Sequence, residues 1–119
     1  MTADRVTKFL DDARFLGEGR YKLVQGVRKE VLGLHKSISE EIKYAGVLFA
    51  GGKAFCGIFS HAKHTSLEFS EAAWLPDKHK VLEGEGKFRR HIKLLSIDDI
   101  AAKHVRDYLA LAFKASHKA

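Results

Sequence analysis

Residues 42–61, which read IKYAGVLFAGGKAFCGIFSH, decide the fold of this chain. Two largely apolar runs, 42–50 and 53–61, flank Gly51 and Gly52. A two-residue glycine loop between such runs is a strong signal for a β-hairpin. We therefore expect two antiparallel strands here. Apolar side chains fall on both faces of the pair, so this hairpin is expected in the middle of a sheet.

The turn also fixes the register of the hairpin. If Ala50 pairs with Lys53, then Gly46 lies opposite Gly57. The two glycines would leave a notch with a floor of backbone and walls of aromatic side chains. One interpretation of the notch is space for a packed helix side chain, and the other is a small apolar pocket. With the only tryptophan added, the residues of that candidate pocket are Tyr44, Gly46, Gly57, Phe59 and Trp74.

The sequence before the hairpin has helical periodicity. Residues 1–38 read as two helices that are separated by Gly17-Glu18-Gly19, and the second helix runs from about 20 to 36. Its apolar side chains recur every three or four residues, while its other side is basic. We therefore expect an amphipathic helical part that packs one face against the sheet.

The sequence after the hairpin predicts two more strands and a final helix. The strands are expected at 65–70 and at about 88–95, and residues 96–116 read as one C-terminal helix. With the sheet over 39–95, the chain forms a single domain over 1–119. The fold class is α+β, with an antiparallel sheet of about four to five strands and the N- and C-terminal helices packed on one face.

Length and composition exclude several classes of protein. A chain of 119 residues has the size of one domain. The single Cys56 excludes a disulfide framework and a Cys-rich zinc module, and its place in the middle of a strand is poor for a reactive thiolate. No apolar stretch approaches the roughly 20 residues of a membrane span, and no signal-peptide pattern is present. We expect a cytoplasmic protein with no membrane partner.

A basic segment, KFRRHIK at 87–93, follows two glycines in a chain whose net charge is +6. Glycines expose backbone N–H groups, and the guanidinium forks of arginine suit phosphates or carboxylates. One interpretation is therefore a ligand or partner surface. The other is architectural, with the basic side chains paired to Glu68, Glu83 or Glu85. The residues of the candidate surface are Gly84, Gly86, Lys87, Arg89, Arg90, His91 and Lys93.

No constellation for catalysis or metal binding is expected. His61 and His64 are three apart at a turn, but metal sites need three or four converging ligands. No nucleophile elbow and no paired carboxylates are evident. We therefore expect a protein that is not an enzyme and has no catalytic residue, metal ligand or resident cofactor. The other histidines are scattered along the chain and read as surface or helix-face residues: His35, His79, His104 and His117.

Several short motifs resemble the YdhG-like family of small domains of unknown function. They are EIKY at 41–44, FCG at 55–57, HTSLEF at 64–69, LPD at 75–77 and LEGEGKFRRHIK at 82–93. The resemblance covers about 39–113, and 82–93 is its most specific part. Many members of that family have a proline a few residues after the Lys-aromatic pair. This chain has Val47-Leu48 there, so it resembles a variant subgroup.

The resemblance implies a fold of the frataxin/YjbR-like superfamily, one branch of which is associated with iron delivery. Fold alone does not determine function. A frataxin-type iron site needs an acidic ridge, whereas Asp11 and Asp12 alternate here with Lys8 and Arg14. We expect a non-enzymatic module that binds a small ligand or a protein, with iron suggested by family analogy alone. The alternative is a module that binds the phosphate backbone of nucleic acid through 87–93.

Overall fold

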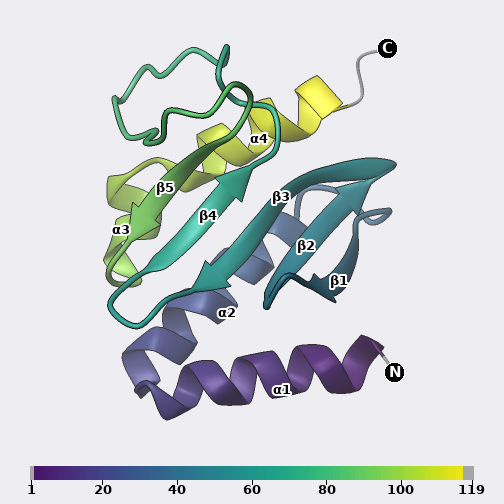
Figure 1. The fold of residues 1–119 in the computed structure, drawn as a ribbon, viewed down its shortest axis with the longest axis vertical. Helices are drawn as coiled ribbons and strands as arrows, with labels where there is room; N and C mark the ends of the chain where they lie inside the picture. Colours follow the sequence, from purple (N-terminus) through teal and green to yellow (C-terminus); the bar gives the residue numbers. More distant parts are fainter. Residues whose placement is uncertain (1, 117–119) are drawn as a thin grey trace.

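The computed structural model describes residues 2–116 and contains a five-stranded antiparallel sheet with helices at both ends of the chain (Figure 1). The order of the strands in the sheet is their order in the sequence. The strands are β1 (Ser39–Lys43), β2 (Gly46–Gly51), β3 (Lys53–Ser60), β4 (Thr65–Phe69) and β5 (Arg90–Leu94). The expected α+β class is confirmed. Residues 1 and 117–119 of the predicted domain lie outside the described residues.

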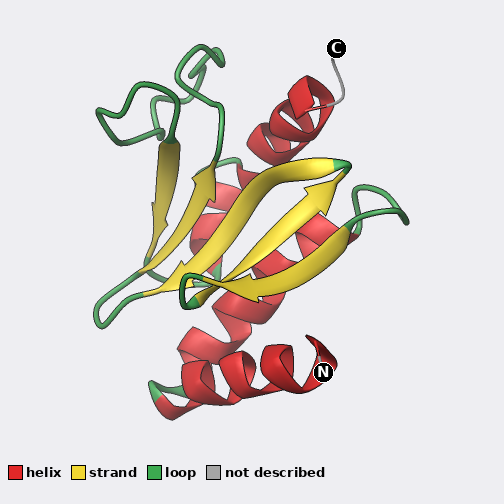
Figure 2. Cartoon of the chain, turned by 45° about the vertical axis from the view of Figure 1, so that its right-hand side comes forward, coloured by secondary structure: helices red, strands yellow, loops and turns green. Residues whose placement is uncertain are grey.

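The helices are α1 (Thr2–Phe15), α2 (Glu18–Leu32), α3 (Asp98–Ala102) and α4 (Val105–Ser116). Helices α2 and α4 lie behind the sheet in Figure 1, and the turned view of Figure 2 shows the same layering. None of the described helices crosses the front face. Helix α1 packs against α2 and reaches β1 and β2. Within residues 2–116, no helix has the length and apolar character that crossing a membrane requires.

The core lies between the covered face of the sheet and the two long helices behind it. Val24, Val27 and Val31 of α2 are fully buried, at the three- and four-residue spacing that the sequence shows. Ile58 and Leu67 from neighbouring strands are also fully buried and face them across the layer boundary. Burial of each such side chain stabilises the fold by roughly 1.5–3 kcal/mol. These contacts hold α2 on the sheet.

The predicted strand over 42–50 is wrong in one respect, because the chain reverses at Tyr44 and Ala45. Their φ angles are 56° and 62°, and Lys43 pairs with Gly46 on either side of them. Positive φ at both loop positions is what a type I′ hairpin turn requires. Such turns are usually marked by Asn or Gly, so a Tyr-Ala pair gave no signal. The sheet therefore has one hairpin more than expected.

The register of the central hairpin differs by two residues from the expected one. Leu48 pairs with Gly57 instead of Phe55. Gly52, whose φ is 111°, forms the tip of the hairpin. Because side chains alternate along a strand, a shift of two leaves most of them on their predicted face. Residues of β2 therefore pair with other residues of β3 than predicted, but most of them stay on the predicted face of the sheet.

A one-residue bulge at Phe55 is the exception to this alternation. The residues on either side of it, Ala54 and Cys56, pair with consecutive residues of β2, so Phe55 has no partner on that strand. A bulge of this kind re-aims the extra side chain. The Phe55 ring is 3% exposed and lies 5.4 Å from the ring of Phe113 on α4. The bulge thus adds an aromatic side chain to the core under α4.

The single C-terminal helix expected over 96–116 is in fact two helices. Helix α3 ends at Ala102, and α4 begins at Val105. His104 lies between them with a φ of 56°. A residue in the left-handed region interrupts the run of helical hydrogen bonds. His104 is consequently placed at a corner of the chain.

An ion pair joins α2 to the first strand of the sheet. The Nε of Arg28 donates to Glu40 Oε2 at 2.8 Å, and its Nη2 donates to Oε1 at 2.6 Å. The two side chains are only 24% and 18% exposed. The hydrogen bonds to Glu40 raise the pKa of Arg28 despite its partial burial. These two hydrogen bonds fix the edge strand β1 to α2.

We expect Arg28→Lys to lower the free energy of unfolding by about 1–2 kcal/mol, because an ammonium group cannot make both hydrogen bonds. Urea unfolding followed by circular dichroism measures the change. Arg106→Lys is the matched control, since Arg106 makes the same two contacts with Glu30 but is 78% exposed. The exposed pair should matter much less. Equal losses in the two variants would contradict a structural role for the Arg28–Glu40 pair.

Candidate functional site

The helix-free face of the sheet, called the outer face below, carries the side chains that alternate with the core. Leu48 and Phe59 give it an apolar region on β2 and β3, and both are half-buried. Glu68 of β4 pairs with His91 of β5, and Lys93 follows His91 on the same face. The outer face is therefore apolar at its centre and charged towards β4 and β5.

The ring of Phe59 lies over Gly46 and Gly57. A Cβ atom at Gly46 would lie 2.5 Å from Phe59 Cδ1, and a Cβ atom at Gly57 would lie 3.1 Å from Phe59 Cε2. The Leu48 side chain would also be 2.7 Å from a Cβ at Gly57. The two glycines do not pair with each other, because Gly57 pairs with Leu48. The expected open notch is therefore wrong, since Phe59 and Leu48 fill that space.

A hollow of about 230 Å³ lies beside these side chains, and part of the predicted pocket borders it. Its lining combines apolar side chains with charged ones: Tyr44, Leu48 and Phe59 with Lys43, Glu68 and Arg89. Tyr44 is 73% exposed. The structure thus brings Tyr44, Gly57 and Phe59 together at one hollow, as the sequence suggested, although the register that places them there is different.

Trp74 lies outside this hollow. It belongs to the segment that joins β4 to β5, and its ring meets the ring of Phe88 edge-on at 5.7 Å between centroids. The side chain is 58% exposed. Trp74 therefore packs against its own connecting segment and does not close the predicted apolar pocket.

The two arginines of the basic segment have different surroundings. Arg90 Nη1 donates to the carbonyl oxygens of Gly86 and Arg89, both at 2.6 Å. Arg90 thus holds the loop before β5. The Arg89 side chain is 74% exposed, and its Nη1 lies 3.8 Å from Glu68 Oε1, which is too long for a hydrogen bond. Arg89 keeps donors that a ligand can use.

The remaining residues of the candidate surface lie on the edge strand β5 or in the loop before it. His91 exchanges backbone hydrogen bonds of 2.8 and 2.9 Å with Glu83, and Gly84 has a φ of 118°. Gly84 is needed for the turn that lays Glu83 along the free edge of β5. This turn explains the presence of Gly84 without phosphate binding. Lys87 lies over the Phe88 ring, with 5.4 Å between its Nζ and the ring centroid.

Positively charged groups gather where β3 turns into β4. The rings of His61 and His64 lie 4.6 Å apart. Burial lowers the pKa of His64, and the nearby His61, Lys93, His91 and Arg20 lower it further. His64 is consequently neutral near pH 7. Lys93 contributes positive charge beside this turn, and Arg20 of α2 donates to the carbonyl oxygens of His61 and Ala62 within it.

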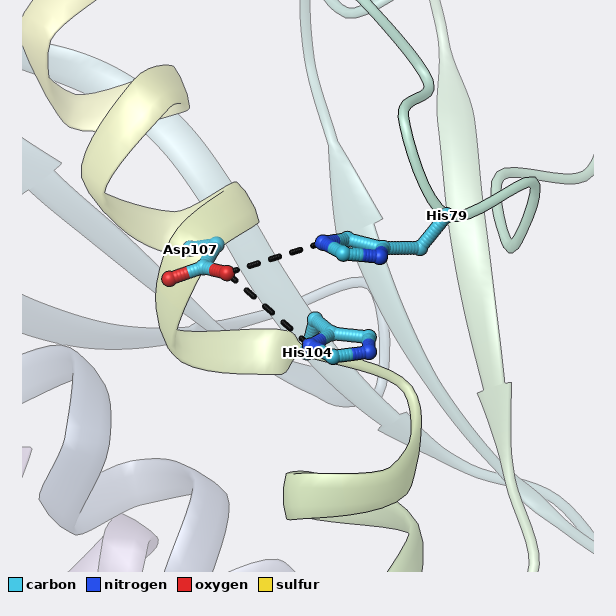
Figure 3. A group of neighbouring side chains, drawn as sticks. All are labelled: His79, His104 and Asp107. Carbon is cyan, nitrogen blue, oxygen red and sulfur yellow. Dashed lines mark ion pairs between the residues drawn. The ribbon is translucent and has the colours of Figure 1, made fainter.

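One group of three metal-ligating side chains converges among the described residues (Figure 3). The rings of His79 and His104 are stacked with 3.5 Å between centroids. Asp107 Oδ2 lies 3.7 Å from His79 Nε2 and 3.9 Å from His104 Nδ1. His79 and His104 are scattered in the sequence, but the fold brings them together from segments that are distant along the chain. The sequence feature that could have indicated this group is the spacing of three residues between His104 and Asp107.

The acidic side chains of α1 and the start of α2 do not fit the iron site that the resemblance implies. Lys8 Nζ lies 3.1 Å from Asp12 Oδ2, and Arg14 Nε lies 3.1 Å from Glu18 Oε1. An iron ridge of the frataxin type needs several carboxylates that face one another without basic partners. Asp12 and Glu18 instead each have a basic partner, so this surface carries mixed charge.

Comparison with known proteins gives no match: no protein-family model, no curated protein and no solved structure matches this chain. The resemblance to the YdhG-like family, and the frataxin-like label of its fold, therefore stay predictions. Function has to be inferred from the side chains that the fold brings together.

We expect Gly46→Ala to lower the free energy of unfolding by about 1–3 kcal/mol, because the added methyl group would meet the Phe59 ring and the Ile58 carbonyl oxygen. Urea unfolding measures the loss. Gly19→Ala is the control. Nothing lies within 4 Å of a Cβ atom there, and Ala in a helix is neutral or stabilising by up to about 1 kcal/mol. A Gly46→Ala protein as stable as the wild type would refute the close approach.

Cys56 should not react with a thiol reagent such as DTNB in native buffer and should react fully in urea. The side chain is 2% exposed, and burial raises the pKa of its thiol far above the ordinary value. The thiolate is the reactive form. Because Cys56 is the only cysteine, the absorbance reports on it alone. Rapid labelling of the folded protein would show that this part of β3 opens to solvent.

Proposed function

We propose that this chain is a cytoplasmic, non-enzymatic binding module that holds a small anionic ligand with an apolar body on its outer face. The observation that carries the proposal is the composition of the hollow on that face. Its floor is apolar and aromatic, through Leu48 and Phe59, and positive charge stands at its margin on Lys43 and Arg89. A ligand with one flat apolar part and one acidic group would contact both.

The charges around the hollow favour an anion over a cation. Lys43 and Arg89 contribute two positive charges, whereas Glu68 contributes one negative charge. Arg89 stands 3.8 Å from Glu68 and retains free donors. A carboxylate, sulfonate or phosphate could therefore form charge-assisted hydrogen bonds with the guanidinium, which are the stronger kind.

The size of the hollow limits the ligand. A volume of about 230 Å³ is below the roughly 300–1,000 Å³ of sites that enclose drug-sized molecules. It has room for one or two rings. The exposed Tyr44 ring stands at the margin, where it can cover an apolar group. Aromatic pairs of this kind contribute about 0.5–1.5 kcal/mol beyond their buried area.

Nucleic-acid binding through 87–93 is the alternative, and the contacts of that segment support it less. Arg90 is occupied by two carbonyl oxygens of its own loop. Lys87, Arg89 and Lys93 remain for phosphates. Non-specific affinity for DNA falls with salt in proportion to the number of phosphates that are neutralised. Three such contacts predict weak binding with a shallow salt dependence.

We expect naphthalene-1-sulfonate, a fluorescent probe with two fused apolar rings and one sulfonate, to bind the folded protein at a single saturable site. In ¹H–¹⁵N spectra, amide shifts should be confined to 43–48, β3 and the residues around Glu68 and Arg89. The double variant Lys43→Ala/Arg89→Ala should raise the dissociation constant on the order of tenfold or more, since two charge-assisted contacts are lost.

Arg5→Ala/Lys22→Ala is the matched control, because it removes two exposed charges of the same types from α1 and α2. Its affinity for the probe should equal that of the wild type. Equal weakening in both double variants, or amide shifts on the helices, would contradict the proposal. A single-stranded oligonucleotide at about 50 mM salt is the comparison ligand. Tight oligonucleotide binding that Lys87→Ala/Lys93→Ala abolishes would favour the alternative.

A further inference from the structure

We propose that His79, His104 and Asp107 bind one divalent transition-metal ion of the class that Zn²⁺ represents. This site is separate from the outer face, because it lies where the β4–β5 segment meets the start of α4 (Figure 3). His79 comes from that segment, His104 from the corner between α3 and α4, and Asp107 from the first turn of α4. Three elements thus bring one ligand each.

The separations within the group suit an ion better than direct bonds between the side chains. The carboxylate oxygen of Asp107 is 3.7 Å from His79 Nε2 and 3.9 Å from His104 Nδ1, and both separations exceed hydrogen-bond length. Zinc holds its nitrogen and oxygen ligands at about 2.0–2.2 Å, so tetrahedral ligand atoms lie about 3.4 Å apart. A contraction of a few tenths of an ångström would bring the Asp107 oxygen to that distance from each histidine nitrogen, and all three ligand atoms already lie within 4.8 Å of one another.

His79 is held in place by a buried contact with α4. The hydroxyl of Tyr108 accepts the backbone N–H of His79 at 3.0 Å and donates to Asp77 Oδ1 at 2.5 Å. Asp77 also accepts the N–H groups of Val81 and Leu82. Tyr108 is 1% exposed. The loop that carries His79 is therefore fixed before any ion arrives. Hydrogen bonds that surround a metal site in this way help to orient the ligands.

The ligand set selects the class of metal. Two imidazole nitrogens and one carboxylate oxygen suit Zn²⁺, Co²⁺, Ni²⁺ and Cu²⁺, whereas Mg²⁺ and Ca²⁺ prefer oxygen ligands alone. Three protein ligands leave at least one position for water or another small molecule. Arg106, the cation next to Asp107 in sequence, is paired with Glu30 through two hydrogen bonds of 2.9 Å. Its charge is thereby offset.

Binding requires the two imidazole rings to turn from their stacked arrangement. Their planes are only 13° from parallel, so the two nitrogen lone pairs do not yet meet at one point. The side chains are 26% and 42% exposed, and hollows of about 570 and 370 Å³ lie on either side of Asp107. Rotation about the terminal torsion of each histidine is therefore open, and an ion can reach the group from solvent.

Titration calorimetry of the full chain without a histidine tag, with ZnCl₂ near pH 7.5, tests the proposal. We expect one Zn²⁺ per chain and no heat with MgCl₂. His79→Ala and Asp107→Asn should each weaken binding by more than about 100-fold, because loss of an outer contact alone costs on the order of 10–100-fold. His104→Asn should do the same, since asparagine tolerates the left-handed backbone at this position. Circular dichroism confirms that each variant folds.

The double variant His61→Ala/His64→Ala is the matched control. It removes two neighbouring histidine rings that belong to no group of three metal-ligating side chains among the described residues. It should bind Zn²⁺ as the wild type does. In the wild type, the Nε2 of His79 and the Nδ1 of His104 should shift in ¹H–¹⁵N imidazole spectra, a result that needs no variant. Absence of binding, wild-type affinity in His79→Ala, or shifts confined to His61 and His64 would overturn the proposal.

Discussion

Burial of a single face of the five-stranded sheet positions the helices and leaves the other face available for binding. Helices α2 and α4 cover that face, and fully buried side chains such as Val27 and Ile58 hold the layers together. The bulge at Phe55 sends one more aromatic ring towards α4. Because α2 and α4 pack on this side and no described helix crosses the other, the alternate side chains of the same strands are left on an uncovered face.

The outer face is shaped by what the glycines allow. Gly46 and Gly57 let the Phe59 ring lie directly on the backbone, with Leu48 beside it. The result is an apolar floor where an open notch was expected. The charged side chains around that floor come from the next strands and from the loop before β5, so the hollow depends on pairing across the whole sheet.

The segment between β4 and β5 links the two proposed sites. It supplies Arg89 to the outer face and His79 to the group beside α4. Two internal contacts hold it, namely Asp77 with Tyr108, and Arg90 with its own loop carbonyls. A segment with little regular structure can therefore present side chains on both sides of the molecule at fixed positions.

The α+β class, the helical ends, the central hairpin and the alternation that divides its faces could be predicted from the sequence, because they follow from local periodicity and a glycine turn. The sequence also placed Tyr44, Gly57 and Phe59 in one candidate region. The Tyr44-Ala45 turn, the Phe55 bulge, the break at His104 and the meeting of His79 with Asp107 could not be predicted and depend on how the whole chain packs. Positive φ at residues other than glycine, and contacts between distant segments, arise from packing of the whole chain and leave no periodic trace in the sequence.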